Sequence, residues 1–377
     1  MRPGLPALAL LAAAACPMDA QQAVPMLSRL AATRADPVYT TYAAGRERSR
    51  FVLDEGYHLR FYDPGLPIEL TSSRAGDLGL GMRLRGRWVY LLRDMAAEPV
   101  ITTSYGDIVR YHYRPFADVR ADVTFLVYSS RLAVQDVTLS NSGAAPLELD
   151  LVALLRGRGA AFGGVAIDSA RGVIRFAHRE PPDSWTSGHA MPHVSAVSDV
   201  LLFSARPDCM AALRSAPSLP RDSAALRADT LRLDPPADGA CPAAPPPPPP
   251  ALPSDTSPAR LLMASKHFVL APGQRASWRL VRGVSPADSS PALLEAAARR
   301  LLDEPLDEYV RADERLYARI PPPPTSDPKK QLLYWGAFTL LHQVMLPPEG
   351  ATRFPYYVFS REPQWGWGHG GQVFHES

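Results

Sequence analysis

The chain has 377 residues, which is long enough for two or three domains and for a large hydrophobic core. Its 40 Lys and Arg residues nearly balance its 38 Asp and Glu residues, so the net charge is only +2. This balance gives no electrostatic basis for binding nucleic acid or an anionic membrane surface, and it agrees better with a neutral partner such as a glycan.

Residues 1–22 have the features of an export signal. Arg2 supplies a positive charge, and an Ala- and Leu-rich run over residues 5–15 follows it, which is too short to span a bilayer. A cut after Ala15 would release the protein, whereas a loose lipobox match would instead place a lipid anchor on Cys16. The sequence therefore predicts an exported protein, periplasmic or extracellular, with lipidation left open. No later stretch is apolar and long enough for a membrane span.

A β-rich region is predicted from residue 50 to residue 284. Residues 119–128 are rich in β-branched and aromatic side chains, and residues 132–139 and 147–155 alternate apolar with polar side chains. Further short strands are expected at residues 89–92, 108–113, 172–176, 200–204, 266–270 and 276–281. Many short strands separated by Gly, Pro, Asn and Asp turns predict a large antiparallel β-sandwich.

A proline-rich stretch over residues 241–258 interrupts this region. Six consecutive prolines favour an extended polyproline II conformation and cannot donate hydrogen bonds to a sheet. We interpret the stretch as a disordered surface insertion, with a docking site for a partner as the alternative. Cys209 and Cys241 lie on either side of a polar excursion that a disulfide would close in an oxidising compartment; two unpaired thiols are the alternative.

Helices are predicted after the β-rich region. Strong helix formers fill residues 292–302, and residues 306–320 place apolar side chains near helical spacing, so residues 291–320 form two linker helices. A third helix is expected over residues 328–346. It is apolar around most of its circumference, which is typical of a helix buried among other helices. The chain contains no later segment to bury it, so we expect residues 328–377 to be the truncated start of a helical domain.

The segment over residues 354–377 has the composition of a sugar-binding site. It crowds aromatic side chains among glycines, which allow tight backbone turns. Flat apolar rings can stack on the C–H face of a pyranose, and nearby polar groups can bond its hydroxyls. The candidate sugar-binding residues are Tyr357, Arg361, Trp365, Trp367, His369 and Gln372. The alternatives are a structural aromatic cluster or a metal site, and the latter is disfavoured because His369 and His375 lack a third ligand at a characteristic spacing.

At this point the sequence resembles the six-hairpin glycosidase superfamily, in which a sandwich and linker helices precede an (α/α)6 barrel. Trp365-Gly366-Trp367 resembles the start of a Trp-rich loop found between the first two barrel helices of several members. The resemblance in architecture covers most of the chain, but the motif covers only residues 354–377. It implies the N-terminal part of a glycoside hydrolase acting on oligo- or polysaccharides, mostly by inversion, without a cofactor or a metal.

The chain departs from the family pattern at the catalytic position. Members carry an acidic residue after the second Trp, where this chain has Gly368-His369, so a catalytic Asp cannot be transferred. Glu376 and Glu362 are the remaining acidic candidates in the segment. The second carboxylate of an inverting pair usually comes from later helices, so we expect this chain alone to be inactive.

Other catalytic classes lack their motifs in this sequence. There is no Gly-x-Ser-x-Gly elbow, no P-loop and no dinucleotide fingerprint. The acidic residues of the sandwich are interpreted as turn and surface groups; they are Asp54, Glu55, Asp63, Glu69, Asp107, Asp118 and Asp122. The rival to a hydrolase is a non-catalytic carbohydrate-binding or cell-surface protein built on the sandwich.

Overall fold

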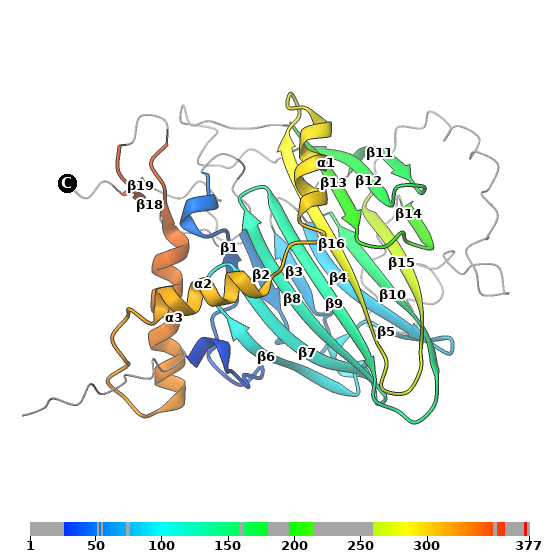
Figure 1. Cartoon of the computed structure of the whole chain (residues 1–377), viewed down its shortest axis with the longest axis horizontal. Coiled ribbons are helices and arrows are strands. Elements are labelled where there is room, and N and C mark those ends of the chain that lie inside the picture. Colours follow the sequence, from blue (N-terminus) through cyan, green and yellow to red (C-terminus); the bar gives the residue numbers. More distant parts are fainter. Residues whose placement is uncertain are drawn as a thin grey trace, which may run out of the picture.

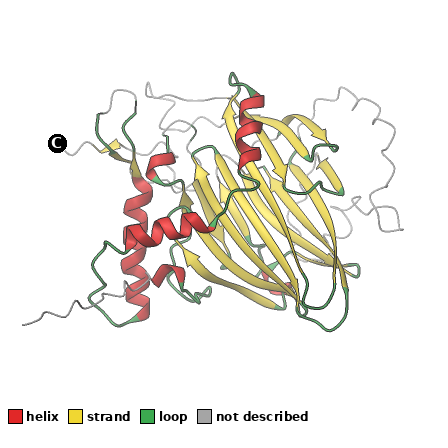
Figure 2. Cartoon of the chain, in the orientation of Figure 1, coloured by secondary structure: helices red, strands yellow, loops and turns green. Residues whose placement is uncertain are grey.

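The computed structural model describes residues 26–50, 53, 56–72, 76–157, 162–179, 196–213, 259–349, 353–358 and 373–374 (Figures 1 and 2). These residues form two eight-stranded antiparallel sheets that face each other, followed by three α-helices. The predicted fold class, an antiparallel β-sandwich followed by helices, is confirmed. Short 3-10 helices lie at Met26–Ser28 (η1), Arg46–Arg48 (η2) and Leu92–Asp94 (η3).

The first sheet has the strand order β1-β2-β3-β4-β10-β15-β14, and β5 pairs with β4. Its strands are β1 (Thr41–Ala43), β2 (Gly56–Arg60), β3 (Glu69–Ser72), β4 (Gly76–Leu84), β5 (Arg87–Val89), β10 (Leu147–Arg156), β14 (Cys209–Leu213) and β15 (Leu261–Leu270). Arg85 and Gly86 join β4 to β5 as a two-residue turn with φ of 50° and 76°. Positive φ at both positions is typical of the tight hairpin turns that match strand twist.

The second sheet has the strand order β11-β12-β13-β16-β9-β8-β7-β6 and lies in front of the first sheet in Figure 1. Its strands are β6 (Ala97–Ser104), β7 (Ile108–Phe116), β8 (Val119–Ser129), β9 (Leu132–Asn141), β11 (Gly163–Asp168), β12 (Val173–Arg179), β13 (Ala196–Phe203) and β16 (Arg275–Pro286). The alternating segments predicted at residues 119–128, 132–139 and 147–155 are strands β8, β9 and β10. The segment predicted at residues 89–92 differs, because β5 ends at Val89 and η3 begins at Leu92.

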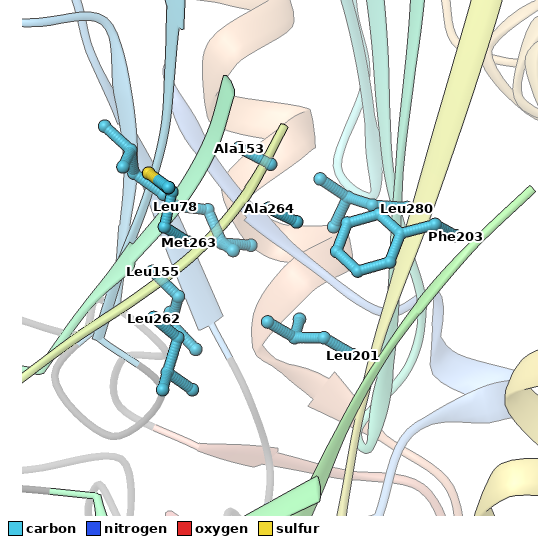
Figure 3. Close-up of a pocket in the computed structure, with 10 residues that line it drawn as sticks. Leu78, Ala153, Leu155, Leu201, Phe203, Leu262, Met263, Ala264 and Leu280 are labelled. Atoms are coloured by element: carbon cyan, nitrogen blue, oxygen red, sulfur yellow. The ribbon is translucent and has the colours of Figure 1, made fainter. Parts of the chain in front are cut away.

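The sandwich interior is filled by alternate residues of the facing strands. In β8, Val119, Ala121, Val123 and Phe125 are buried, and the residues between them are half-buried on the opposite face. Between the sheets lies a cavity of about 10 Å³, lined by apolar side chains that include Leu78, Phe203 and Leu280 (Figure 3). This is room for about one water molecule without polar partners, so the cavity is a packing void rather than a ligand site.

Among the described residues, three α-helices follow the sandwich: α1 (Pro291–Arg300), α2 (Asp307–Tyr317) and α3 (Pro328–Val344). They match the predicted helical segments to within a few residues. Proline starts both α1 and α3, where a missing backbone N–H is harmless. The Asp327 side chain accepts a hydrogen bond from the Lys329 N–H and caps α3.

Helix α1 lies on the outer face of the second sheet, against β13 and β16. Gly283 in β16 makes this approach possible, because a Cβ there would lie 3.0 Å from Leu294 Cδ1. Arg279 of the same strand donates to the Glu304 carbonyl oxygen at 2.7 Å, just beyond the end of α1. A cation at this position also interacts favourably with the helix dipole.

Helices α2 and α3 pack against the turn between β6 and β7. The Tyr105 ring meets Tyr317 of α2 edge to face, with 5.0 Å between ring centroids. The Tyr317 hydroxyl donates to Thr339 Oγ1 of α3 at 3.0 Å, and Gln343 Nε2 of α3 donates to the Gly106 carbonyl oxygen. One turn of the sandwich therefore positions both helices.

Helix α3 is apolar on two sides. One side faces the sandwich and α2, where Leu332, Trp335 and Val344 are buried. The other side exposes Leu333, Leu340 and Leu341, which are 59%, 41% and 51% exposed. Their spacing along the helix makes a continuous apolar stripe. Within the described residues, one apolar side of α3 is therefore covered and the other is exposed.

The role of Gly283 can be tested by substitution. Gly283→Val should lower the free energy of unfolding by about 1–3 kcal/mol, because the new side chain overpacks the contact with α1. Urea unfolding checks this. The control is Gly163→Ala, where a Cβ meets only the Ala177 carbonyl oxygen at 3.9 Å. Equal stability of the two variants would show that α1 is not packed closely on β16.

Candidate functional site

The aromatic C-terminal segment is held at the end of α3 by a small three-stranded sheet. Its strands are β17 (Met345–Leu346), β18 (Tyr356–Val358) and β19 (Val373–Phe374), in that order. Figure 1 shows this sheet at one end of the molecule, beyond α3 and away from the two large sheets. Because Val358 pairs with Val373, the two ends of residues 359–372 are held side by side.

Alternation along β18 explains which side chains point outward. Val344, Leu346, Tyr356 and Val358 form a small buried cluster. Tyr357 has the opposite orientation in the strand and is 43% exposed. The Tyr356 hydroxyl donates to a Glu349 carboxyl oxygen, which satisfies this buried tyrosine. The sheet therefore has a buried apolar side that fixes it and an opposite side on which Tyr357 is accessible.

Of the predicted site residues in this segment, the structure describes Tyr357. The others lie outside the described residues: Arg361, Glu362, Trp365, Trp367, His369, Gln372 and Glu376. Their identity as sugar-binding or catalytic groups stays a prediction. Cys209 lies in β14 and is disulfide-bonded, while Cys241 and Cys16 also lie outside the described residues.

A buried charge network in the first sheet was missed by the sequence analysis. Glu69 is 1% exposed and accepts hydrogen bonds from Arg156 Nη2 at 2.9 Å, from the Tyr90 hydroxyl at 2.7 Å, and from Arg60. Asp77 accepts from the same Arg156 nitrogen at 2.7 Å. Burial raises the pKa of Glu69, while Arg156 and Arg60 act to lower it. The interpretation of Glu69 as a turn or surface acid is wrong, because strand pairing brings distant arginines to it.

A second buried network lies between the sheets. Arg282 Nη2 donates to Asp199 Oδ1 at 2.9 Å, and Asp199 Oδ2 lies 2.6 Å from His178 Nδ1. Arg282 Nη1 donates to the Tyr57 hydroxyl of the first sheet at 3.0 Å. Arg282 and Asp199 are 1% and 3% exposed. The bond from Arg282 to Tyr57 connects the two sheets, and the Arg282–Asp199 pair is too deeply buried to meet a polysaccharide in this structure.

An accessible polar row crosses the outer face of the first sheet. Trp88 of β5, Arg83 of β4, Asp150 of β10 and His267 of β15 are consecutive cross-strand partners. Arg83 Nε donates to Asp150 Oδ2 at 2.8 Å, and Asp150 Oδ1 lies 2.9 Å from His267 Nδ1. The Arg83 guanidinium lies 5.9 Å from the Trp88 ring centroid. Half of the His267 side chain is exposed, at 49%.

This row combines an aromatic ring with groups that can bond hydroxyls. Alternation in residues 147–155 and 266–270 predicts that Asp150 and His267 lie on the outer faces of their strands. The sequence does not show that β10 and β15 pair, because the proline-rich insertion separates them. The networks around Glu69 and Arg282, in contrast, are buried within the fold. The outer row is therefore the described cluster best placed to meet a polar ligand.

Within the described ranges, no three His, Cys, Asp or Glu side chains are grouped closely enough to hold a metal ion. None of the described helices has the length and hydropathy needed to cross a membrane.

No family model matches the chain, and no curated protein matches its sequence. Solved structures of carbohydrate-active enzymes resemble it distantly. A bacterial glucoamylase complexed with acarbose matches over 84% of this chain, with a TM-score of 0.45 and 8% identity. A family GH92 α-mannosidase from Bacteroides thetaiotaomicron in complex with mannoimidazole matches over 84%, with a TM-score of 0.37 and 10% identity.

A protein described as a kojibiose phosphorylase from the human microbiome matches over 78% of the chain, with a TM-score of 0.39 and 6% identity. The chain covers 43% of the glucoamylase, 42% of the α-mannosidase and 36% of the phosphorylase structure. It therefore spans less than half the length of each of them.

The structural role of the interior network can be measured directly. Asp199→Ala should lower the free energy of unfolding by about 3–5 kcal/mol, because it leaves the Arg282 charge buried without its carboxylate. The control is Asp122→Ala, which breaks a pair with Arg120 whose side chains are 40% and 38% exposed and should cost less than about 1 kcal/mol. Chemical denaturation of both variants checks the difference, and equal losses would contradict a structural role for the interior pair.

Proposed function

We propose that this chain is the N-terminal part of an exported glycoside hydrolase, and that residues 359–372 form a sugar subsite. The observation that carries the proposal is the β18–β19 pairing, which holds both ends of this aromatic, glycine-rich segment together. The exposed Tyr357 at its base adds a further ring on the accessible side. Ligand sites combine apolar faces with a few polar groups, and Arg361, His369 and Gln372 would supply those groups.

The exposed stripe on α3 supports a further helical domain. Leu333, Leu340 and Leu341 present an apolar surface that another helix would cover, as expected if α3 belongs to an (α/α)6 barrel. In this proposal Glu376 and Glu362 are the candidate acids from this chain, and a second carboxylate comes from the added helices. Hydrolysis by inversion would then follow from two carboxyl groups about 6.5–9.5 Å apart.

The proposed location is outside the cytoplasm, periplasmic or extracellular. The N-terminal signal pattern supports export, and Cys16 is the candidate lipid anchor. A disulfide-bonded Cys209 agrees with an oxidising compartment.

A second candidate function is supported by the outer row of the first sheet. In a non-catalytic carbohydrate-binding protein, the Trp88 ring would stack on a sugar while His267, Asp150 and Arg83 bond its hydroxyls. This alternative predicts binding by the sandwich itself, without any group from the C-terminal segment.

One pair of variants separates the two functions. In the whole protein, Trp367→Ala should weaken binding of the best oligosaccharide from an immobilised panel by about 1–3 kcal/mol, since an aromatic contact of that size is lost. Trp88→Ala should leave this affinity unchanged. Isothermal titration calorimetry gives both values, with thermal unfolding as a check on folding.

The reverse pattern would favour the sandwich site: a loss of affinity in Trp88→Ala and none in Trp367→Ala. Unchanged affinity in Trp367→Ala together with a large drop in melting temperature would mean that the aromatic segment is structural. Hydrolysis products from the same oligosaccharide, followed by chromatography, distinguish an enzyme from a binding protein.

A further inference from the structure

Two carboxyl groups meet where α2 packs on the sandwich. Asp107 lies in the turn between β6 and β7, and Asp313 lies on α2, with a hydrogen bond between the two side chains. Asp107 Oδ1 and Asp313 Oδ2 are both buried, and no N–H or hydroxyl group of the described residues donates to either. Asp107 lies in a turn, as interpreted from the sequence. The interpretation of Asp107 as a surface acid is wrong, because the residue is only 6% exposed.

Arg48 of η2 is the cation beside this pair. Its Nη2 donates to Asp107 Oδ2 at 2.6 Å, and its Nε donates to the Tyr128 carbonyl oxygen at 2.6 Å. The guanidinium also lies 4.7 Å from the ring centroid of Tyr309 on α2. Arg48 thus forms an ion pair with Asp107, and no ion pair to Asp313 is present among the described residues.

Two ionised carboxylates at hydrogen-bond distance repel each other, and neither can donate. A single proton removes both problems: Asp313 can donate to Asp107, while Asp107 stays ionised beside Arg48. Burial raises the pKa of both carboxyls, and the charge of Asp107 raises the pKa of Asp313 further, well above its usual range. The contact between the two carboxyls and the charges around them both favour one shared proton.

We propose that Asp107 and Asp313 hold one proton between them, and that its loss as the pH rises weakens the attachment of α2 to the sandwich. The folded state binds this proton more tightly than the unfolded state does. The stabilising contribution is therefore complete below the unfolded pKa of Asp313, falls as the pH rises above that value, and is fully lost once the pH exceeds the raised folded pKa. The relevant window therefore begins at the ordinary pKa of an Asp side chain, about 3.9, and extends up to the raised pKa of Asp313.

Other groups that face the pair do not produce the same loss of stability with rising pH. They are Arg46 and Arg48 of η2, Tyr105 of the turn, Tyr128 of β8, Tyr309, Glu314 and Tyr317 of α2, and His342 of α3. Burial lowers the pKa of His342, and Arg46 lowers it further, so the titration of this imidazole makes the fold more stable as the pH rises, opposite in sign to the proposed effect. Burial raises the pKa of Tyr105, Tyr309 and Tyr317, so these hydroxyls stay neutral.

The test is hydrogen exchange of the full chain between about pH 5 and about pH 9, expressed as protection relative to the intrinsic exchange rate. In the wild type, protection of α2 should fall by about ten-fold or more across this range, because one pKa unit corresponds to a factor of ten. Protection of β8 should stay constant. Asp313→Asn supplies a permanent N–H donor to Asp107, so its α2 should be less sensitive to pH and better protected than wild type at about pH 9.

Asp122→Asn is the matched control, since it makes the same Asp-to-Asn change at a surface position, where Asp122 pairs with Arg120; it should follow the wild-type pH dependence. Constant α2 protection in the wild type would overturn the proposal, and so would an equal pH dependence in Asp313→Asn. Should Asp313→Asn fail to fold, carboxyl ¹³C NMR of the wild type decides. A raised titration of Asp313 that coincides with loss of α2 protection supports the shared proton, and a titration near the ordinary value excludes it. The inference does not depend on the proposed function.

Discussion

The packing of α2 and α3 on the turn between β6 and β7 is the contact on which the C-terminal part of the structure depends. Tyr105, Gly106 and Asp107 are consecutive, and each meets a helical residue through a different interaction: an aromatic contact with Tyr317, a hydrogen bond from Gln343, and a carboxyl pair with Asp313. Helix α3 then leads directly into β17. The position of β17, and of the three-stranded sheet that it starts, is therefore set by a short turn of the sandwich.

The sandwich can serve as a rigid base because its two sheets are joined by more than apolar contact. The hydrogen bond from Arg282 to Tyr57 connects a strand of the second sheet to a strand of the first. Removal of one partner from a buried pair is costly, whereas a well-packed apolar replacement can be neutral. The alternation of β8 and its neighbours supplies apolar side chains that fill the space between the sheets.

The sequence was most informative where a pattern was long and local. Strands β8 to β10 alternate over ten or eleven residues each, and the helices contain runs of strong helix formers, so both were predicted nearly in full. Strands β2 to β4 were not individually predicted, because β2 and β3 are short and Gly76, Gly79 and Gly81 break the pattern of β4. Chain composition also marked the aromatic segment as chemically unusual without needing any tertiary contact.

Burial of charged groups could not be predicted, because it depends on partners far along the chain. Glu69 pairs with Arg156 across 87 residues, and Asp107 pairs with Arg48 across 59 residues. The same holds for the outer row, in which Asp150 and His267 are 117 residues apart. A single sequence contains the residue types of these networks but not the strand order that brings them together.

A crystal structure of the whole protein with a bound oligosaccharide tests the central claim most directly. The account predicts a sugar ring stacked on Trp365 or Trp367, with hydroxyls bonded by Arg361, His369 or Gln372. A sugar ring on Trp88 of the sandwich, with the aromatic segment packed away from the ligand, would contradict it.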